Sequence, residues 1–494
     1  MSETRGIKHF EIDHLRSNLK QRSLRAGAIT ILSQGATLVL TIGSTMVLAR
    51  LLTPSDFGLL AMVAPIVGFV GLFKDLGLSM ATIQRDQIDH GQISTLFWIN
   101  VAASVALAAL TMILAPLVGS FYGDPRTVWI TVAFAWMMIL GGMTAQHLAL
   151  IQRQMRFGSL AVVEIVAAAA GVASGITAAL LGCGYWSLVI MQAATATANL
   201  AMVWSLNGWR PGLPVRGSGI GDMLKFGGNL TGATAMGYVA RNIDNVLIGK
   251  AWGEMALGLY SKAYTLLLYP LYQINTPVSR VAIPALSRLQ KEPERYRAAY
   301  LNIVDKILLA TLPGIVTLVV ASDWIVDIIL GPQWKGAVEI FFWLGIAAFT
   351  QPLTNTTGWL FITQGRTGEQ LRLSVVGSLL VALAVLVGLP WGPVGVAASY
   401  AISGLFVRTP IVLWAVTRHG PVGFGDFAAV AAPFLLSAAV MSAVLLGMRS
   451  LWAPGAVAGL ASCIVLAYTI QAGVVLAIPA QRKSLTGLWH RRLA

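Results

Sequence analysis

The sequence predicts an all-α polytopic membrane protein with about 14 transmembrane helices. Hydrophobic residues make up 56% of its 494 residues and charged residues only 11%, with a mean hydropathy of +0.73. A soluble domain carries about 25% charged residues, so this mixture excludes a soluble globule. Apolar runs of roughly 20 residues recur along the whole chain, which is the length a helix needs to cross a bilayer.

The predicted spans are separated mostly by short Gly- and Pro-rich segments, such as Thr53-Pro54-Ser55-Asp56 and Tyr122-Gly123-Asp124-Pro125. Both residue types interrupt helices and favour turns. In chain order, the spans are predicted at 26–48, 57–82, 95–119, 127–148, 159–181, 185–206, 223–248, 259–285, 300–322, 338–362, 371–389, 392–416, 425–446 and 455–478.

The positions of Lys and Arg test this pattern of spans. If both termini are cytoplasmic, the inner segments hold 23 of the 34 basic residues and the outer loops hold 5; the remaining six lie within or at the ends of spans. Such an excess on one side follows the positive-inside rule, so it supports an even number of spans and cytoplasmic termini. The net charge of +14 therefore has a membrane explanation, and we expect no nucleic-acid partner.

The two cysteines, Cys183 and Cys463, lie in or beside apolar segments and have no Cys or His spacing typical of a metal site or a disulfide framework. We expect no metal and no cofactor. Residues 1–24 are polar and basic and precede a full-length span without a small-residue cleavage site. They are interpreted as a cytoplasmic tail rather than a removable signal peptide.

An internal repeat predicts the domain organisation. Residues 48–63 and 248–263 match at an offset of 200 positions, which aligns Arg50 with Lys250 and Gly58 with Gly258. The copies lie six spans apart, so both run in the same direction. This predicts two parallel six-helix lobes, at 25–208 and 217–418, followed by two further helices at 422–479 and a basic tail at 480–494. Parallel repeats with a site between them are a known transporter design.

The most distinctive residues form the run Arg241-Asn242-Ile243-Asp244-Asn245-Val246-Leu247-Ile248-Gly249-Lys250, followed by Leu257-Gly258-Leu259-Tyr260-Ser261-Lys262. This run resembles the Wzx-like polysaccharide exporters, among them the colanic-acid and teichuronic-acid exporters of the multidrug/oligosaccharidyl-lipid/polysaccharide superfamily. Pro284-Ala285-Leu286-Ser287-Arg288 and Ala49-Arg50-Leu51-Leu52-Thr53-Pro54 are similar to the same pattern, so the resemblance covers nearly the whole chain.

The resemblance implies a fold like that of the multidrug (MATE) exporters, with two lobes around a central cavity. It also implies an activity: movement of an undecaprenyl-pyrophosphate-linked oligosaccharide from the inner to the outer leaflet of the bacterial inner membrane, by alternating access. Extracellular polysaccharide or lipopolysaccharide would be the product, membrane lipid the surroundings, and the polysaccharide polymerase and export machinery further partners. The protein would not be an enzyme.

Charged and amide side chains inside the spans are the candidate substrate-binding groups, because intramembrane ionisable residues are rare and usually face a cavity or a partner. They are Arg241, Asn242, Asp244, Asn245, Lys262, Arg280, Lys74 and Arg408. Arg241 and Asp244 are three positions apart, so they are predicted to share a helix face. Arg241 lies about 24 Å along its span, in the outer third of the membrane. Two interpretations remain: that it binds phosphate or sugar, or that it pairs with Asp244 and extends to the outer interface.

Other functions are less consistent with the sequence. A membrane glycosyltransferase would need catalytic groups on sizeable outer loops, and the predicted loops are short. A cation-coupled small-molecule exporter of the same superfamily is a closer alternative, but it would carry an acid in the first span, which 26–48 lacks. A peptidoglycan-precursor flippase, with a related lipid-linked substrate, stays open.

Overall fold

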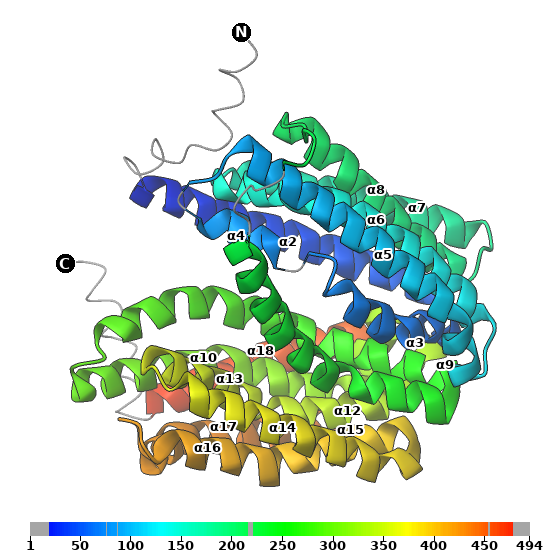
Figure 1. The fold of residues 1–494 in the computed structure, drawn as a ribbon. Coiled ribbons are helices and arrows are strands. Elements are labelled where there is room, and N and C mark those ends of the chain that lie inside the picture. The colour runs from blue at the N-terminus through cyan, green and yellow to red at the C-terminus, as the bar shows by residue number, and fades with distance from the viewer. Residues whose placement is uncertain (1–18, 76, 86, 216–220, 453–454, 478–494) are drawn as a thin grey trace. The chain divides into compact units, whose positions relative to one another are not determined.

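A computed structural model describes residues 19–75, 77–85, 87–215, 221–452 and 455–477, and in these ranges every regular secondary-structure element is a helix (Figure 1). The chain divides into two compact units, Met1–Gly258 and Leu259–Ala494, each of which is considered by itself. The structure therefore confirms an all-helical protein.

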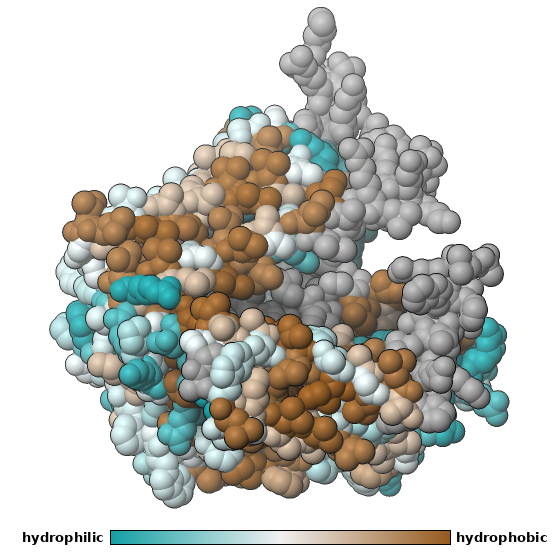
Figure 2. Space-filling view, turned by 180° about the vertical axis from the view of Figure 1, so that it is seen from behind, coloured by the Kyte–Doolittle hydropathy of each residue, from teal (hydrophilic) through white to brown (hydrophobic). Residues whose placement is uncertain are grey.

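Ten helices in the described residues are long and apolar enough to cross a membrane, or eleven if one bent pair of helices counts as a span. The surface of the molecule shows wide apolar areas (Figure 2). For example, Ile113, Leu117 and Trp136 are 75%, 68% and 62% exposed. Apolar surface of this extent is rare on soluble proteins, and lipid is the medium that tolerates it.

The first unit is built from seven helices and the beginning of an eighth. These are α2 (Leu19–Leu51), α3 (Pro54–Gly71), α4 (Leu78–Gln84), α5 (His90–Tyr122), α6 (Arg126–Arg153), α7 (Phe157–Leu180), α8 (Trp186–Asn207) and the first part of α9 (Gly221–Arg288). The predicted turn residues set their ends. Thr53 and Asp56 form a capping box at the start of α3, and Gly123 ends α5 with a φ of 74°.

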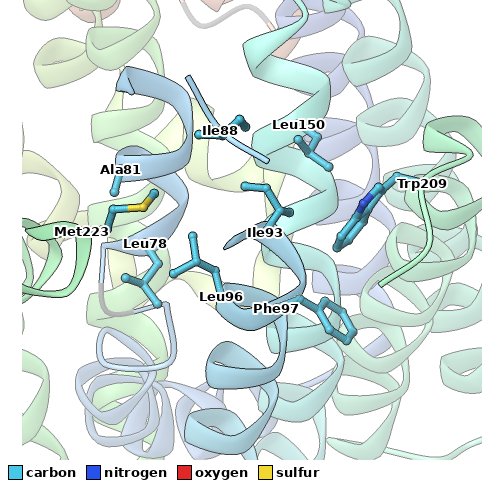
Figure 3. Close-up of a cluster of buried hydrophobic side chains, with 9 residues drawn as sticks. All are labelled: Leu78, Ala81, Ile88, Ile93, Leu96, Phe97, Leu150, Trp209 and Met223. Carbon is cyan, nitrogen blue, oxygen red and sulfur yellow. The ribbon is translucent and has the colours of Figure 1, made fainter. Parts of the chain in front are cut away.

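Small residues allow the helices of this unit to approach closely. In α7, a Cβ atom on Gly171 would lie 1.9 Å from Oγ1 of Thr195 in α8, and one on Gly175 would lie 2.8 Å from Cβ of Met191. This spacing of two glycines four residues apart is a common packing surface between membrane helices. At one end of the unit, nine buried side chains from α4, α5, α6, α9 and the connecting segments form an apolar cluster, which includes Phe97 and Trp209 (Figure 3).

One predicted span of the first unit is broken. The expected helix at 57–82 is divided into α3, which ends at Gly71, and α4, which begins at Leu78. Gly77 has a φ of 65°, a conformation that glycine adopts without strain. The carboxylate of Asp75 accepts a hydrogen bond from the backbone N–H of Ser79 and so satisfies one of the free donors at the start of α4.

The second unit contains the rest of α9 and a bundle arranged around α10, which packs against α12, α17 and α18. Its helices are α10 (Pro293–Val320), α11 (Ser322–Ile329), η2 (Pro332–Trp334), α12 (Ala337–Ala348), α13 (Gln351–Thr363), α14 (Thr367–Gly388), η3 (Leu389–Trp391), α15 (Gly392–Ser403), η4 (Gly404–Arg408), α16 (Thr409–Thr417), α17 (Phe424–Leu451) and α18 (Ala456–Ala477). Buried hydroxyl pairs join α10 to α13: Tyr300 to Thr356 at 2.9 Å and Tyr296 to Thr363 at 2.6 Å.

Four further predicted spans have irregular geometry. The span expected at 338–362 is bent by 43° between α12 and α13. The spans expected at 223–248 and 259–285 form the single long α9, which bends at Gly253, where φ is 79° and ψ is −174°. A π-helical turn, Gly404–Arg408, interrupts the span expected at 392–416. Such irregularities are tolerated at membrane depth where neighbouring protein groups satisfy the backbone.

Candidate functional site

The polar cluster at 241–245 lies on α9 within the first unit. Arg241 is exposed, Asn242 and Asn245 are half-buried, and Asp244 is only 8% exposed. The amide of Asn242 donates to the carbonyl oxygen of Tyr238 at 2.9 Å, and a carboxylate oxygen of Asp244 accepts from the backbone N–H of Asn245 at 2.9 Å. Arg241 and Asp244 therefore lie in different environments, although the sequence predicted a shared face.

The Arg241 side chain follows the ordinary geometry of an α-helix. Its guanidinium lies over Gly237, one turn earlier in the helix, where a Cβ atom would be 3.3 Å from Nη1. Long side chains on any α-helix lean towards its beginning in this way. The contact is therefore compatible with both interpretations of Arg241 that the sequence left open.

Tyr238 anchors this part of α9 to α3. Its hydroxyl donates to the carbonyl oxygen of Ala64 at 3.2 Å. Its ring lies 6.5 Å from that of Phe69, and a Cβ atom on Gly68 would lie 2.0 Å from the hydroxyl. In the structure Tyr238 positions the helix that carries Arg241.

Replacing Tyr238 is expected to separate these contributions. Tyr238→Phe keeps the ring over Gly68 and loses one hydrogen bond, a net cost of about 1 kcal/mol. Tyr238→Ala also removes the ring and leaves a space against α3, at a cost of about 3–5 kcal/mol. The Tm of Tyr238→Phe should stay close to that of the wild type and the Tm of Tyr238→Ala should fall clearly, as measured by thermal unfolding of the purified protein. An equal fall in both variants would instead indicate that the hydroxyl, rather than the ring, holds α9 against α3.

The repeat at 48–63 and 248–263 forms a symmetric crossing between α3 and α9. A Cβ atom on Gly58 would lie 1.7 Å from the carbonyl oxygen of Glu254, and one on Gly258 would lie 1.9 Å from the carbonyl oxygen of Pro54. Pro54 and Glu254, like Gly58 and Gly258, are 200 positions apart. Each copy of the repeat thus places its carbonyl against the glycine of the other copy, so the sequence repeat is also a contact in space.

Ionic contacts surround this crossing. Lys250 donates to the carbonyl oxygen of Phe121 at 2.5 Å and lies over its ring. Arg126 contacts Asp124 at 2.6 Å and Glu254 at 3.1 Å. The hydrogen bond from the Arg126 side chain holds the pKa of the Asp124 carboxyl below its usual range. These contacts therefore hold the turn between α5 and α6 against the bend of α9.

Lys74 lies in the break between α3 and α4 and is half-buried. Its ammonium rests on α6, where a Cβ atom on Gly141 would lie 2.8 Å from Nζ. The neighbouring Asp75 contacts Ser79 and Asn100. The sequence pointed to Lys74 but missed Asn100, because an asparagine in a long apolar helix shows no partner until that helix is packed.

The remaining candidates belong to the second unit. Lys262 is partly buried on α9. Arg408 lies in the π-helical turn, where its guanidinium donates to the carbonyl oxygen of Tyr400 at 2.6 Å and lies 4.0 Å from the Tyr400 ring centroid. These contacts hold Arg408 against its own helix. The side chain of Arg280 is outside the described part of the chain.

The structure thus brings four candidates together on one helix, Arg241, Asn242, Asp244 and Asn245, and places Lys74 in the same unit. Lys262 and Arg408 are in the other unit. No group of three or more His, Cys, Asp or Glu side chains arranged to hold a metal ion occurs among the described residues.

Comparison with known proteins identifies the family. The family model described as "Polysaccharide biosynthesis protein" matches residues 47–339, more than half of the chain. The chain belongs to this family. It includes Wzx-like exporters, and it is a family of transporters rather than enzymes. The protein is therefore a multi-pass membrane transport protein of polysaccharide biosynthesis.

Individual relatives agree with this assignment. The lipopolysaccharide biosynthesis protein WzxC of Escherichia coli is 25% identical over 350 residues, covering 69% of this chain and 70% of the relative. The teichuronic acid biosynthesis protein TuaB of Bacillus subtilis is 27% identical over 376 residues, covering 75% and 78%. The succinoglycan biosynthesis transport protein ExoT of Rhizobium meliloti is 23% identical over 410 residues, covering 82% and 80%.

Solved structures show the fold of this exporter. The lipid II flippase MurJ in an inward closed conformation superposes with a TM-score of 0.73 at 12% identity, covering 92% of this chain and 99% of MurJ. An inward-facing MATE family transporter of the MOP superfamily gives a TM-score of 0.56 at 15% identity, covering 77% and 94%. The predicted MATE-like fold is thus confirmed.

Proposed function

We propose that the protein flips an undecaprenyl-pyrophosphate-linked oligosaccharide from the inner to the outer leaflet of the bacterial inner membrane by alternating access. The observation that carries this proposal is Arg241, an exposed cation on a long, mostly apolar helix of a transport protein of polysaccharide biosynthesis. The relatives WzxC, TuaB and ExoT, which belong to lipopolysaccharide, teichuronic acid and succinoglycan biosynthesis, support a polysaccharide precursor as the cargo.

The chemistry of the cargo explains why such a residue is needed. A pyrophosphate with attached sugars is too polar to enter hydrocarbon, whereas the polyprenyl tail can stay in lipid. A carrier therefore needs cationic and amide groups at membrane depth, in a cavity that opens to each side in turn. Charged hydrogen bonds between arginine and phosphate are among the strongest that proteins form.

The architecture within the proposal has 14 crossings, two parallel six-helix lobes and two additional helices, with both termini cytoplasmic. Several described helices support this count. Counting the bent pair α12–α13 as one span gives eleven. The long α9 and the stretch Thr367–Thr417 are each long enough for two crossings. The eleven spans do not include α9, which adds two crossings. They count Thr367–Thr417 once, so its second crossing adds one more, and the total becomes 14.

Within the site, we assign Arg241 and Lys262 to the phosphate or sugar of the cargo, with Asn242 and Asn245 as neighbouring hydrogen-bonding groups. Asp244 is assigned a positioning role, because its burial keeps it from the surface where Arg241 lies. We assign Lys74, Arg280 and Arg408 to binding of the pyrophosphate in the inward-open state. The contacts of Arg408 with Tyr400 would have to be released for this role.

A clean deletion of the gene tests the function. We expect loss of exported polysaccharide, and lipid-linked oligosaccharide accumulating in the cytoplasmic leaflet, where an enzyme added to inside-out vesicles can reach it. A plasmid copy of the full chain should restore export. Normal surface polysaccharide after deletion, with altered efflux of dyes, would favour a small-molecule exporter; a defect in the cell wall alone would favour a peptidoglycan-precursor flippase.

A further inference from the structure

The break between α3 and α4 places an acid in an apolar environment in the interior of the first unit. Asp75 lies in this break, and no Asp, Glu, Lys or Arg occurs in α4 or α5. Discontinuous helices expose backbone and side-chain oxygens at membrane depth, where transporters use them to bind cations. An ionised carboxylate is costly there unless a positive charge or a proton compensates it.

The groups around Asp75 are oxygen-rich. One carboxylate oxygen accepts from the hydroxyl of Ser79 at 2.7 Å and from the amide of Asn100 at 3.2 Å. The Ser79 hydroxyl is also 3.4 Å from the carbonyl oxygen of Ala145. The carboxylate therefore contacts α4 and α5 directly, and α6 lies next to it through Ser79.

Two buried polar side chains on α5, the helix whose Asn100 contacts Asp75, have unused hydrogen-bonding capacity. Asn100 is fully buried and its Oδ1 atom has no hydrogen-bond partner among the described residues. Ser104, one turn further along α5, is also fully buried, and its hydroxyl likewise has no partner in the described ranges. It lies against Gly142, where a Cβ atom would be 2.3 Å from Oγ. Buried polar atoms are rarely left without a partner, so these two indicate that a ligand completes the cluster.

The helices next to Asp75, which are α4, α5 and α6, carry no Asp or Glu, so Asp75 is the acid of this region. Lys74 is its neighbour in the chain; its ammonium lies at Gly141 and also attracts the Asp75 carboxylate electrostatically, without forming an ion pair within 4 Å among the described residues. On α6, the Arg153 guanidinium donates to the carbonyl oxygens of Thr82 and Arg85, and the His147 ring stacks on Trp204 at 4.6 Å.

We propose that Asp75 is the binding site of the coupling cation, with Ser79, Asn100 and Ser104 as its neighbouring oxygen groups. The ligand is a monovalent cation, either a proton on the carboxylate or Na⁺ among the oxygens. Asp75 is half-buried, so a cation has access to it. The role of this cation in coupling rests on the proposed transport function, whereas its binding at Asp75 does not.

Cation binding to the purified full-length protein, without any lipid-linked cargo, tests the proposal. The test variant is Asp75→Asn, which keeps an oxygen for the Ser79 contact that caps α4. The matched control is Glu164→Gln, which removes an exposed acid from α7 in the same unit. Thermal unfolding is measured in NaCl and in choline chloride of equal ionic strength, and infrared difference spectra are recorded across pH.

If the ligand is Na⁺, NaCl should raise the Tm of the wild type and of Glu164→Gln by a few degrees and leave that of Asp75→Asn unchanged. If the ligand is a proton, the carboxylic-acid C=O absorbance that grows as the pH falls should lack one component in Asp75→Asn relative to the wild type, because one of the 20 Asp and Glu residues is removed. Glu164→Gln should retain that component. The proposal is overturned if neither signal depends on Asp75. It is also overturned if both signals disappear in Glu164→Gln and persist in Asp75→Asn.

These outcomes are distinguishable from failure of the proposed function. A cation signal that depends on Asp75, together with normal polysaccharide in the deletion strain, would retain the site and reject the flippase. Loss of export in the deletion strain without such a signal would retain the flippase and reject the site.

Discussion

Replacing Arg241 with alanine is expected to reduce export by about 10- to 150-fold without lowering the amount of protein in the membrane. Removing a hydrogen bond to a charged group costs about 1.5–3 kcal/mol, and each 1.4 kcal/mol corresponds to a tenfold change. Arg241 is exposed and lies over Gly237, so its removal leaves no buried cavity. The measurement is surface polysaccharide, normalised to the membrane level of an epitope-tagged protein.

Two further variants sharpen this test. Arg241→Lys retains the charge but not the planar, two-pronged geometry that matches phosphate, so it should recover part of the activity. Arg50→Ala removes one exposed charge from the same unit, at the position aligned with Lys250 in the repeat, and should export normally. If Arg241→Ala merely lowers the protein level and activity per molecule is unchanged, the residue has a structural role.

The glycine crossing is expected to give the largest effect on stability. Gly58→Ala and Gly258→Ala each place a methyl group less than 2 Å from a backbone carbonyl oxygen of the other segment, at 1.7 Å and 1.9 Å. Because the obstructing atoms belong to the backbone, no change of rotamer relieves the clash. Overpacking of a well-packed contact costs about 1–3 kcal/mol and occasionally more. Both variants should show a lower Tm and reduced export.

Matched controls are available in α2. Gly35 and Gly43 have no atom within 4 Å of an added Cβ. Alanine in the interior of a helix is favoured over glycine by about 1 kcal/mol, so Gly43→Ala should leave the Tm unchanged or raise it. Opposite signs at Gly58 and Gly43 would show that the crossing, rather than loss of glycine flexibility, is responsible. Equal Tm values for all four variants would contradict the crossing.

We expect export to depend on the glycine crossing, because α9 takes part in the crossing and carries Arg241. The crossing joins α3 to α9, the helix that carries Arg241, and Tyr238 adds a second contact between the same two helices. The position of Arg241 in the first unit therefore depends on this packing. A change at Gly58 is expected to act on export through α9, even though Gly58 itself has no group that could bind the cargo.

Much of the fold was predictable because membrane crossing imposes a simple pattern. A helix that meets lipid must be apolar for about 20 residues, and its connections collect glycine, proline and charge. The boundaries at Thr53-Pro54 and Tyr122-Gly123 follow from this rule. The repeat at an offset of 200 was also visible, since equivalent turns require equivalent residues.

The features that were not predictable depend on contacts distant in the chain. The span at 57–82 looks continuous because Lys74 and Asp75 occupy only two positions in it, yet Asp75 instead caps α4 and accepts from Asn100, 25 residues away. Arg241 and Asp244 are neighbours on a helix, but their different burial is set by what packs against each side. The bend at Gly253 and the π-helical turn at Arg408 likewise have no periodic signal.

The sequence by itself determined that this protein is a polytopic helical exporter of the Wzx-like family, because hydropathy and the motif at 241–262 are local properties of the chain. Only the tertiary structure decided how that motif is used. It buried Asp244, and it set Gly58 against Glu254 and Gly258 against Pro54. It also placed Asp75 beside Asn100. Pairings between distant segments follow from side-chain packing, and no local pattern of residues specifies them.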